Sequence, residues 1–400
     1  MYISFPNLLA INGGTPVRET LLPYGHQWID RSDINAVMDV LSSEWLTTGP
    51  LVNKFETCFS EFTNSKNAVA VSSGTAALHS AIFAAGIKKG DEVIVPAITF
   101  VATANCVLYL GGIPVFADIE PDTLLIDPDV IQSLITPKTK AIIAMDYAGQ
   151  PCDYGALRDI AEDHDLILIA DACHSLGGKH HNKMVGSLAD LNVFSFHPVK
   201  AITTGEGGMI TTDNDELAKK MRIFRNHGIS TDHRERQIKG SWNYEMIELG
   251  FNYRITDFQC ALGISQLKKL PRWIERRNFI ALEYINCLKE LPEIVPLITK
   301  SNNINAYHLF VIILESGKLE NQRDYIFKAL RAEGIGVNVH YSPVYYHPYY
   351  QISLKYSRGM CPKAENIFPR LLSLPIYPAM QERDLNDVRT ALRKVTDAVL

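Results

Sequence analysis

The chain lacks the features that would place it in a membrane, on a nucleic acid or outside the cell. No apolar run in its 400 residues reaches the roughly 18 to 20 residues that a membrane-spanning helix needs. No basic run interrupts a sequence whose formal net charge is −5, which argues against a nucleic-acid partner. The opening residues, MYISFPNLLAINGG, lack the basic start of a secretory signal. We therefore expect a soluble, cytoplasmic protein that binds neither membranes nor nucleic acids.

Cysteine is sparse and irregularly spaced. Seven cysteines occur, none of them in a C-x-x-C pair, and several lie within apolar runs. Such spacing is not that of a disulfide framework or a zinc site, so it predicts reduced thiols and no bound metal.

Two common nucleotide-binding signatures are also missing. No G-x-G-x-x-G follows the first predicted strand, which argues against a Rossmann dinucleotide site. The turn at residues 205–208, GEGG, lacks a following Lys-Ser or Lys-Thr and precedes a strand rather than a helix, so it is not a Walker A loop. A phosphate-bearing ligand would need another kind of site.

What is present is an ordinary globular composition, with 46% hydrophobic and 21% charged residues. Because 400 residues is long for a single core, we expect two domains. We assign residues 1–264, including the N-terminal segment, to a large ligand-binding domain. We assign residues 265–400 to a smaller α+β domain.

Short apolar runs alternate with helical patterns between residues 67 and 213. Most of the runs are unbroken, as in strands that helices cover on both faces. The predicted strands are residues 68–71, 92–95, 114–117, 141–145, 166–170, 192–196 and 209–212. The helices predicted between them are residues 75–85, 102–110, 128–134 and 154–163. This order predicts an α/β sandwich with a mainly parallel sheet of about seven strands.

The pattern changes after Asp257. Two long helices are predicted over residues 258–270 and 271–288. The remaining elements are expected to be a strand at 307–314, a helix at 323–333, a strand at 337–341 and a closing helix at 381–399.

A lone lysine, Lys200, follows the predicted strand 192–196, in a loop that also presents Ser195 and His197. Because two buried strands flank this loop, we expect Lys200 to be partly buried. Burial lowers the pKa of an amine, which frees it as the nucleophile for a Schiff base. The alternative is an ordinary solvated lysine in a surface loop.

Two other strand ends carry polar residues. The segment VSSGTAAL at 71–78 runs from a strand directly into a helix, so Ser73, Gly74 and Thr75 could form a phosphate cup or only a helix cap. Asp171 ends an apolar strand, at the edge of the sheet where ligands bind in α/β proteins, and it could pair with a protonated heteroaromatic nitrogen. His174 could stack on or hydrogen-bond a cofactor there. Alternatively, Asp171 is a helix cap and His174 a structural histidine.

Together these residues predict pyridoxal phosphate (PLP) as the cofactor. PLP needs a phosphate site, a carboxylate on its pyridine nitrogen and a lysine on its aldehyde. The phosphate cup, Asp171 and Lys200 would supply these three groups in chain order.

The sequence resembles the DegT/DnrJ/EryC1/StrS family of sugar aminotransferases from about Gln27 to the C-terminus. The matching segments are LTTGP (46–50), SGTAAL (73–78), PAITFVATAN (96–105), PVFAD (114–118), DACH (171–174), SFHPVK (195–200), GEGG (205–208) and NYR (252–254). The resemblance implies the aspartate-aminotransferase-like fold, which is fold type I of the PLP-dependent transferases.

The resemblance also implies a role for each matching residue. Lys200 would carry the cofactor's aldehyde and Asp171 would face the pyridine nitrogen. The remaining roles are phosphate binding by Ser73, Gly74, Thr75 and Ser195, ring stacking by Phe100, contact with the phenolic oxygen by His174, and contact with the partner's phosphate by Asn252. Since Asn252 would reach across a dimer interface, a homodimer with shared active sites is expected.

Within the family, the segments DYAG (146–149), FSFHPVKAITT (194–204), FRNHG (224–228) and VHYSPV (339–344) are most similar to transaminases of pseudaminic acid biosynthesis. This implies transfer of an amino group from L-glutamate to a UDP-4-keto-6-deoxy-N-acetyl-hexosamine. The product would be UDP-4-amino-4,6-dideoxy-N-acetyl-β-L-altrosamine. His227, His340 and Tyr341 are candidates for the sugar-nucleotide pocket, or else packed loop and strand residues.

Three alternatives remain. A transaminase of this family could act on another nucleotide sugar, of the perosamine or bacillosamine type. A sugar dehydratase of the same fold would carry histidine in place of Lys200, so the lysine favours transamination. A non-catalytic regulatory member would be expected to lose Lys200 or Asp171, and both are present.

Overall fold

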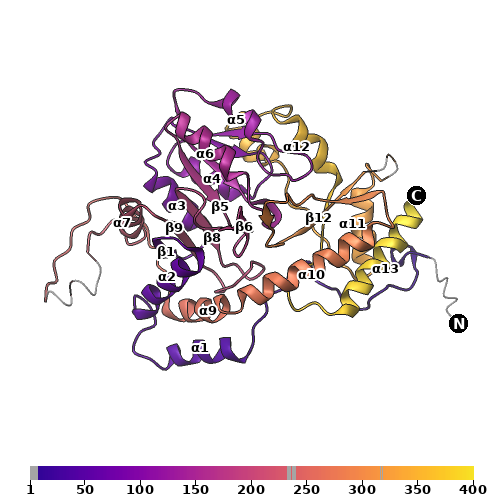
Figure 1. Cartoon of the computed structure of the whole chain (residues 1–400), viewed down its shortest axis with the longest axis horizontal. Helices are drawn as coiled ribbons and strands as arrows, with labels where there is room; N and C mark the ends of the chain where they lie inside the picture. Colours follow the sequence, from indigo (N-terminus) through magenta and orange to yellow (C-terminus); the bar gives the residue numbers. More distant parts are fainter. Residues whose placement is uncertain (1–7, 232–235, 237–239, 316, 318) are drawn as a thin grey trace.

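The computed structural model describes residues 8–231, 236, 240–315, 317 and 319–400. A seven-stranded sheet forms the centre of the molecule (Figure 1). Its strand order is β1-β9-β8-β5-β4-β2-β3, and every neighbouring pair is parallel except the two that involve β9. The strands are β1 (Asn67–Val71), β2 (Glu92–Pro96), β3 (Ile113–Ala117), β4 (Thr139–Met145), β5 (Ile167–Asp171), β8 (Leu191–Ser195) and β9 (Gly208–Thr212).

Helices follow the strands and cover the sheet. They are α2 (Pro50–Thr63), α3 (Gly74–Ala84), α4 (Val101–Tyr109), α5 (Pro128–Leu134), α6 (Tyr154–Asp163) and α7 (Asp215–Phe224). Almost every side chain of α3 is buried, because α3 packs between β8 and β9 on one side and α4 and α7 on the other. The predicted fold class, an α/β sandwich around a mainly parallel sheet of seven strands, is confirmed.

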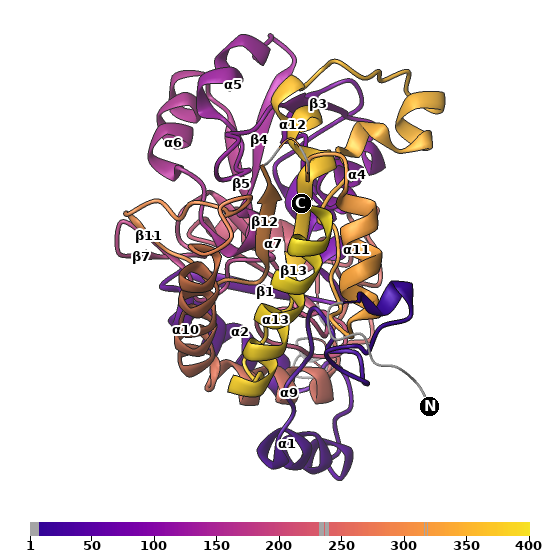
Figure 2. The same ribbon diagram turned by 90° about the vertical axis from the view of Figure 1, so that its right-hand side faces the viewer.

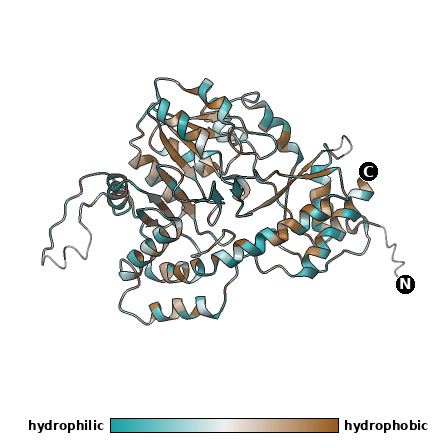
Figure 3. Cartoon of the chain, in the orientation of Figure 1, coloured by the Kyte–Doolittle hydropathy of each residue, from teal (hydrophilic) through white to brown (hydrophobic). Residues whose placement is uncertain are grey.

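A second core lies in the C-terminal part. There β10 (Ile294–Pro296), β12 (Phe310–Leu314) and β13 (Leu371–Leu374) form an antiparallel sheet. Figure 2 shows α13 (Glu382–Val399) between α10 (Leu270–Leu288) and α11 (Arg323–Ala332), in contact with both. These helices alternate between hydrophobic and hydrophilic residues along their length, whereas the central strands are mainly hydrophobic (Figure 3). This part has the smaller α+β architecture that the sequence predicts.

The two cores are joined by α10. Its first half, with Trp273 and Ile274, packs into the large core, and its second half, with Ile280 and Tyr284, packs into the second. The described N-terminal residues also reach the second core, where Leu9 and Leu22 are buried. The division into residues 1–264 and 265–400 therefore stays a prediction.

The strand predicted at residues 337–341 is not formed. Only Asn338 pairs with the free edge of β13, through two backbone hydrogen bonds with Ser373 of 3.2 and 2.7 Å. Beyond it the strand pairing stops: the His340 side chain hydrogen-bonds the Ser373 hydroxyl, and the Tyr341 side chain packs against Tyr147 and His174. The strand predicted at 337–341 is therefore reduced to one bridge at Asn338.

Smaller elements complete the described chain: η1 (Ala10–Asn12), α1 (Arg31–Leu41), η2 (Tyr147–Gly149), β6 (Lys179–His180), β7 (Lys183–Met184), α9 (Asp257–Leu267), β11 (Asn303–Ile304), η3 (Val344–Tyr346), η4 (Tyr349–Ser353), α12 (Pro362–Ile367) and η5 (Phe368–Arg370). Of the helices in the described residues, none is both long and apolar enough to cross a bilayer. All seven cysteines are free.

Candidate active site

Lys200 lies in the loop between β8 and β9, beside the carboxyl end of β5. Its backbone N–H donates to the carbonyl oxygen of His197 at 2.9 Å. Burial lowers the pKa of the Lys200 amine, although the nearby Cys173 and Asp171 act in the opposite direction. An amine with a lowered pKa is more often neutral and therefore nucleophilic.

Asp171 is the last residue of β5 and is only 3% exposed. One of its oxygens accepts a hydrogen bond from the Thr103 hydroxyl at 2.7 Å, and the other accepts the Cys173 N–H at 3.3 Å. Both donors are neutral, so a buried negative charge remains for a cationic group to balance. A protonated pyridine nitrogen would be such a group. Thr103 lies in the PAITFVATAN segment but was not predicted as a site residue.

The predicted phosphate cup is assembled from three chain segments. Ser73 caps α3, and its hydroxyl accepts the Ala76 N–H at 3.1 Å. Gly74 lies so close to β8 that an added Cβ would be 2.7 Å from Cβ of Ser195. Gly208, opposite Ser195 in the sheet, lies closer still to Ser73, since a Cβ added to it would be 2.4 Å from the Ser73 carbonyl oxygen. The first-turn N–H groups of α3, from Gly74 and Thr75, have no acceptor within the helix and suit a phosphate.

We expect Gly74→Ala to weaken PLP binding on the order of tenfold, because the new methyl group pushes Ser195 and the start of α3 apart. Titration of the apoenzyme with PLP, followed by absorbance, measures the affinity. Gly155→Ala is the matched control, since it also lies in a first helical turn, where the added Cβ would meet only a carboxylate oxygen of Asp153 at 3.3 Å. Equal affinities in the wild type and Gly74→Ala would contradict the assignment.

Histidines and tyrosines form a wall beside Lys200. His174 is 1% exposed, and its Nε2 hydrogen-bonds the Tyr341 hydroxyl at 3.2 Å. Its Nδ1 is buried without a hydrogen-bond partner. The ring of His308 lies 4.2 Å from that of His174. Burial, reinforced by the nearby Lys200, lowers the pKa of His174 well below its usual value, so the ring is neutral and can donate or accept one hydrogen bond.

His308 was not predicted, although it follows Tyr307 at the start of a predicted strand. Backbone hydrogen bonds from Ala306 to Gly149 at 2.9 Å and from Leu309 to Ala148 at 3.1 Å hold its segment against η2. The guanidinium of buried Arg277 donates to the carbonyl oxygen of Tyr307 at 2.9 Å. These hydrogen bonds hold the short segment 306–309 in place, and this segment positions His308 beside His174.

Three other residues predicted for the site, Phe100, His340 and Tyr341, lie near one another. Phe100 precedes α4, is 52% exposed and has its ring 5.9 Å from that of Tyr341. Nδ1 of His340 hydrogen-bonds the Ser373 hydroxyl at 2.9 Å, and burial lowers the pKa of His340 to about 4. The hydroxyl of Tyr147 donates to the His340 carbonyl oxygen. Phe100, His340 and Tyr341 therefore lie around His174.

Two predicted site residues, His227 and Asn252, do not lie beside His174. His227 is exposed and lines a different cavity, of about 720 Å³, together with Arg254. Asn252 is also exposed and pairs with Asn226 through a backbone bridge. The next residue, Tyr253, accepts the backbone N–H of Ser72 at 2.9 Å, which places this segment behind the phosphate cup. His227 thus does not share a pocket with His340 and Tyr341.

A helix N-terminus suited to a phosphate, the buried carboxylate of Asp171 and the half-buried Lys200, at one edge of a fold type I sheet, match the requirements of PLP. The comparisons with known proteins agree, and the protein is a PLP-dependent sugar aminotransferase. It belongs to the DegT/DnrJ/EryC1/StrS aminotransferase family, whose model matches residues 27–393.

Individual relatives cover nearly the whole chain. SpsC of Bacillus subtilis, a spore coat polysaccharide biosynthesis protein, is 40% identical over 380 residues, or 94% of this chain and 98% of SpsC. Helicobacter pylori PseC, an aminotransferase involved in the biosynthesis of pseudoaminic acid, is 33% identical with a TM-score of 0.88, over 95% of this chain and 100% of PseC. Spr1654 of Streptococcus pneumoniae, in its PMP form, is 31% identical with a TM-score of 0.90, over 95% of this chain and 100% of that one.

Proposed function

We propose that the enzyme transfers the amino group of L-glutamate to C4 of a UDP-4-keto-6-deoxy-N-acetyl-hexosamine. The product would be UDP-4-amino-4,6-dideoxy-N-acetyl-β-L-altrosamine, a precursor of pseudaminic acid. One observation carries the chemistry: the half-buried Lys200, whose amine has a lowered pKa, lies beside the buried carboxylate of Asp171. The free cysteines suit a reducing compartment, so we place the reaction in the cytoplasm.

Each residue of the site has a proposed task. Bound PLP would supply an electron-accepting ring. Lys200 would first hold the cofactor and then, once displaced by the donor amine, move a proton between substrate and cofactor carbons as a general base and acid. Asp171, oriented by the Thr103 hydroxyl, would keep the pyridine nitrogen protonated.

The remaining residues would position the cofactor. Gly74 and Thr75 would bind the phosphate through backbone N–H groups, and Ser73 and Ser195 through their hydroxyls. The neutral His174 would hydrogen-bond the phenolic oxygen, since its Nδ1 has no partner in the protein. Phe100 would cover the ring, and His340 and Tyr341 would border the sugar.

The similarity to PseC supports the proposed sugar. The higher identity to SpsC, 40% against 33%, favours a second candidate, in which the acceptor is another nucleotide-linked 4-keto sugar of a surface polysaccharide. The perosamine and bacillosamine types belong to this class. Both candidates share the same site and the same amine transfer.

We also propose a homodimer with shared active sites. The described residues between α7 and α9, namely 225–231, 236 and 240–256, include a part that extends away from the central sheet (left in Figure 1). It exposes large apolar side chains, with Trp242 at 87%, Leu249 at 75% and Met246 at 65% exposure. A second copy of the chain would cover them, since surfaces of this kind mark interaction sites. Asn252, at the end of this segment, would then reach the partner's cofactor phosphate.

A panel of sugar nucleotides tests the proposal. The enzyme is incubated with L-glutamate, PLP and UDP-, GDP- or dTDP-linked 4-keto-6-deoxy sugars, and products are identified by mass and NMR. We expect nitrogen at C4 of the UDP-linked N-acetyl sugar, with turnover at least about tenfold above the other nucleotides. A preference for a GDP- or dTDP-linked sugar would support the second candidate, and no amination of any sugar would overturn both.

A further inference from the structure

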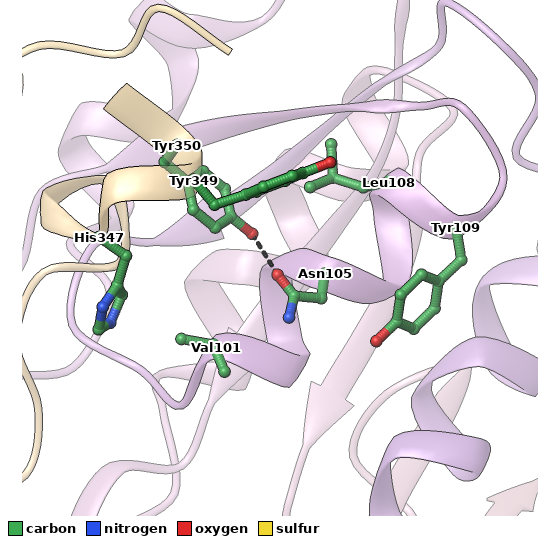
Figure 4. Close-up of a pocket in the computed structure, with 7 residues that line it drawn as sticks. All are labelled: Val101, Asn105, Leu108, Tyr109, His347, Tyr349 and Tyr350. Carbon is green, nitrogen blue, oxygen red and sulfur yellow. Dashed lines mark hydrogen bonds between the residues drawn. The ribbon is translucent and has the colours of Figure 1, made fainter. Parts of the chain in front are cut away.

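A second carboxylate, that of Asp146, is buried at the edge of the sheet where Asp171 lies. Asp146 follows β4, which pairs in parallel with β5, and its backbone N–H donates to the Asp171 carbonyl oxygen at 3.1 Å. Asp146 is 0% exposed. Neither the cavity of about 720 Å³ that contains His227 nor the hollow of about 390 Å³ beside α4 (Figure 4) is lined by it. Because a buried carboxylate needs hydrogen-bond partners, its contacts within the protein are informative.

Three neutral groups donate to the Asp146 carboxylate. Oδ1 accepts the backbone N–H of Cys152 at 2.9 Å and the hydroxyl of Tyr154 at 2.8 Å. Oδ2 accepts the hydroxyl of Ser175 at 2.5 Å, and it has no other donor among the described residues. One carboxylate oxygen is therefore held twice, whereas the other depends on Ser175.

The charge of Asp146 sets the direction of the Ser175 hydrogen bond. Burial raises the pKa of Asp146 to about 6, and the nearby Asp171 adds to this rise, while the three hydrogen bonds oppose it. Above neutral pH the group is ionised, and an ionised carboxylate can only accept hydrogen bonds. The Ser175 hydroxyl must then be the donor. Its other acceptor, the Ala172 carbonyl oxygen, is farther away, at 3.4 Å.

Ser175 ends the turn that carries His174. The turn begins at Ala172, whose N–H donates to the carbonyl oxygen of Val193 in β8 at 2.9 Å. The N–H of Ser175 closes the turn by donating to the Ala172 carbonyl oxygen at 3.1 Å. The start of the turn is thus attached to β8, and its end is attached to Asp146, after β4, by the Ser175 hydroxyl. His174 lies between these two attachments.

We propose that Asp146 is a positioning residue, which acts through Ser175 to hold His174 in the place from which His174 contacts bound PLP. The atom concerned is Nδ1 of His174, which is buried without a hydrogen-bond partner in the protein. This inference rests on the proposed role of His174 at the phenolic oxygen, but it does not depend on which sugar is the acceptor. Because binding and catalysis are sensitive to displacements of about 1 Å, loss of the Ser175 hydrogen bond should weaken the contact.

Ser175→Ala and Tyr154→Phe form a matched pair of variants, because each removes one hydroxyl that donates to the same buried carboxylate. Only Ser175 adjoins His174. Tyr154 lies at the start of α6, and the oxygen that it contacts keeps the N–H of Cys152. We expect Ser175→Ala to weaken the binding of PLP to the apoenzyme about fivefold, and Tyr154→Phe to weaken it less than about twofold, as measured by absorbance titration. Ser175→Ala alone should also shift the absorbance maximum of the bound cofactor.

Two further variants show whether the effect passes through His174. In a His174→Ala background, Ser175→Ala should weaken PLP binding by less than about twofold, since the group that it positions is already missing. Asp146→Asn keeps the volume of the side chain, so it tests the same contact if Ser175→Ala does not fold. Its amide nitrogen cannot accept the Ser175 hydroxyl, and the affinity for PLP should again fall.

The outcomes are distinct. Unchanged affinity in both Ser175→Ala and Asp146→Asn would overturn the inference. Equal losses in Ser175→Ala and Tyr154→Phe would also overturn it, because the carboxylate would then act only on the stability of the fold. A loss that persists undiminished in the His174→Ala background would have the same meaning. The titrations need neither glutamate nor a sugar, so they decide the role of Asp146 even if the sugar panel overturns the proposed reaction.

Discussion

Replacing Lys200 with alanine is expected to abolish transamination, lowering the rate by about 10⁴-fold or more. The variant loses both the covalent attachment of PLP and the amine that moves the proton. It should still fold, because Lys200 lies in a loop and makes its only described hydrogen bond there through its backbone N–H. The rate of 2-oxoglutarate formation and the visible absorbance of the lysine-bound cofactor are the two measurements.

Lys183→Ala is the control for this experiment. Lys183 is an exposed residue of the short strand β7 and is not among the site residues described above. It should keep both the absorbance band and the rate of the wild type. Transamination by Lys200→Ala at the wild-type rate would show that another amine holds the cofactor.

Asp171→Asn is expected to bind PLP but to lose about 10³-fold in rate. A neutral amide cannot hold a proton on the pyridine nitrogen, so the ring becomes a poorer electron acceptor. Asparagine has nearly the same size as aspartate. The affinity for PLP, measured by absorbance titration, should therefore fall far less than the rate. An unchanged rate would remove Asp171 from the mechanism.

Variants of Thr103 test whether the orientation of the Asp171 carboxylate matters in addition to its charge, because the Thr103 hydroxyl donates a hydrogen bond to that carboxylate. Thr103→Ser keeps the donor at 2.7 Å from the carboxylate and should be close to the wild type. Thr103→Val removes it and leaves a buried acceptor with one hydrogen bond fewer, which costs about 1–3 kcal/mol of stability. A loss of rate in the valine variant that the serine variant does not share would identify Thr103 as a residue that positions Asp171.

The sequence predicts the central sheet well, because its seven strands are buried on both faces and therefore appear as unbroken apolar runs. Asp171, Ser195 and Ser73 stand at or just beyond the ends of such runs. Asp171 and Ser195 meet at one edge because β5 and β8 pair in parallel, and Ser73 reaches the same edge because β1 and β8 both run antiparallel to β9. Their proximity to Lys200 follows from the short connection between β8 and β9.

The positions of the histidines beside His174 could not be predicted in the same way. His308 and His340 lie in segments that the sequence predicts as strands, but nothing in those patterns indicates that tertiary packing brings the two side chains to the site of His174. The sequence at 337–341 predicts a strand, yet strand pairing ends at Asn338. After it, the ring of Tyr341 packs against that of Tyr147. His227 matches a family segment but lines the separate cavity of about 720 Å³, where its backbone N–H donates to the carbonyl oxygen of Phe251 at 3.0 Å.

The anchored segment around His308 has a consequence for engineering and for evolution. Backbone hydrogen bonds join Ala306 and Leu309 to η2, so the C-terminal part of the chain supplies some of the residues that surround His174 and Lys200. A chimaera that joins the sheet of this enzyme to the lobe of a relative would exchange His308, His340 and Tyr341 in one step. If His340 and Tyr341 border the sugar as we propose, recombination could transfer acceptor preference while the cofactor chemistry stays with the host.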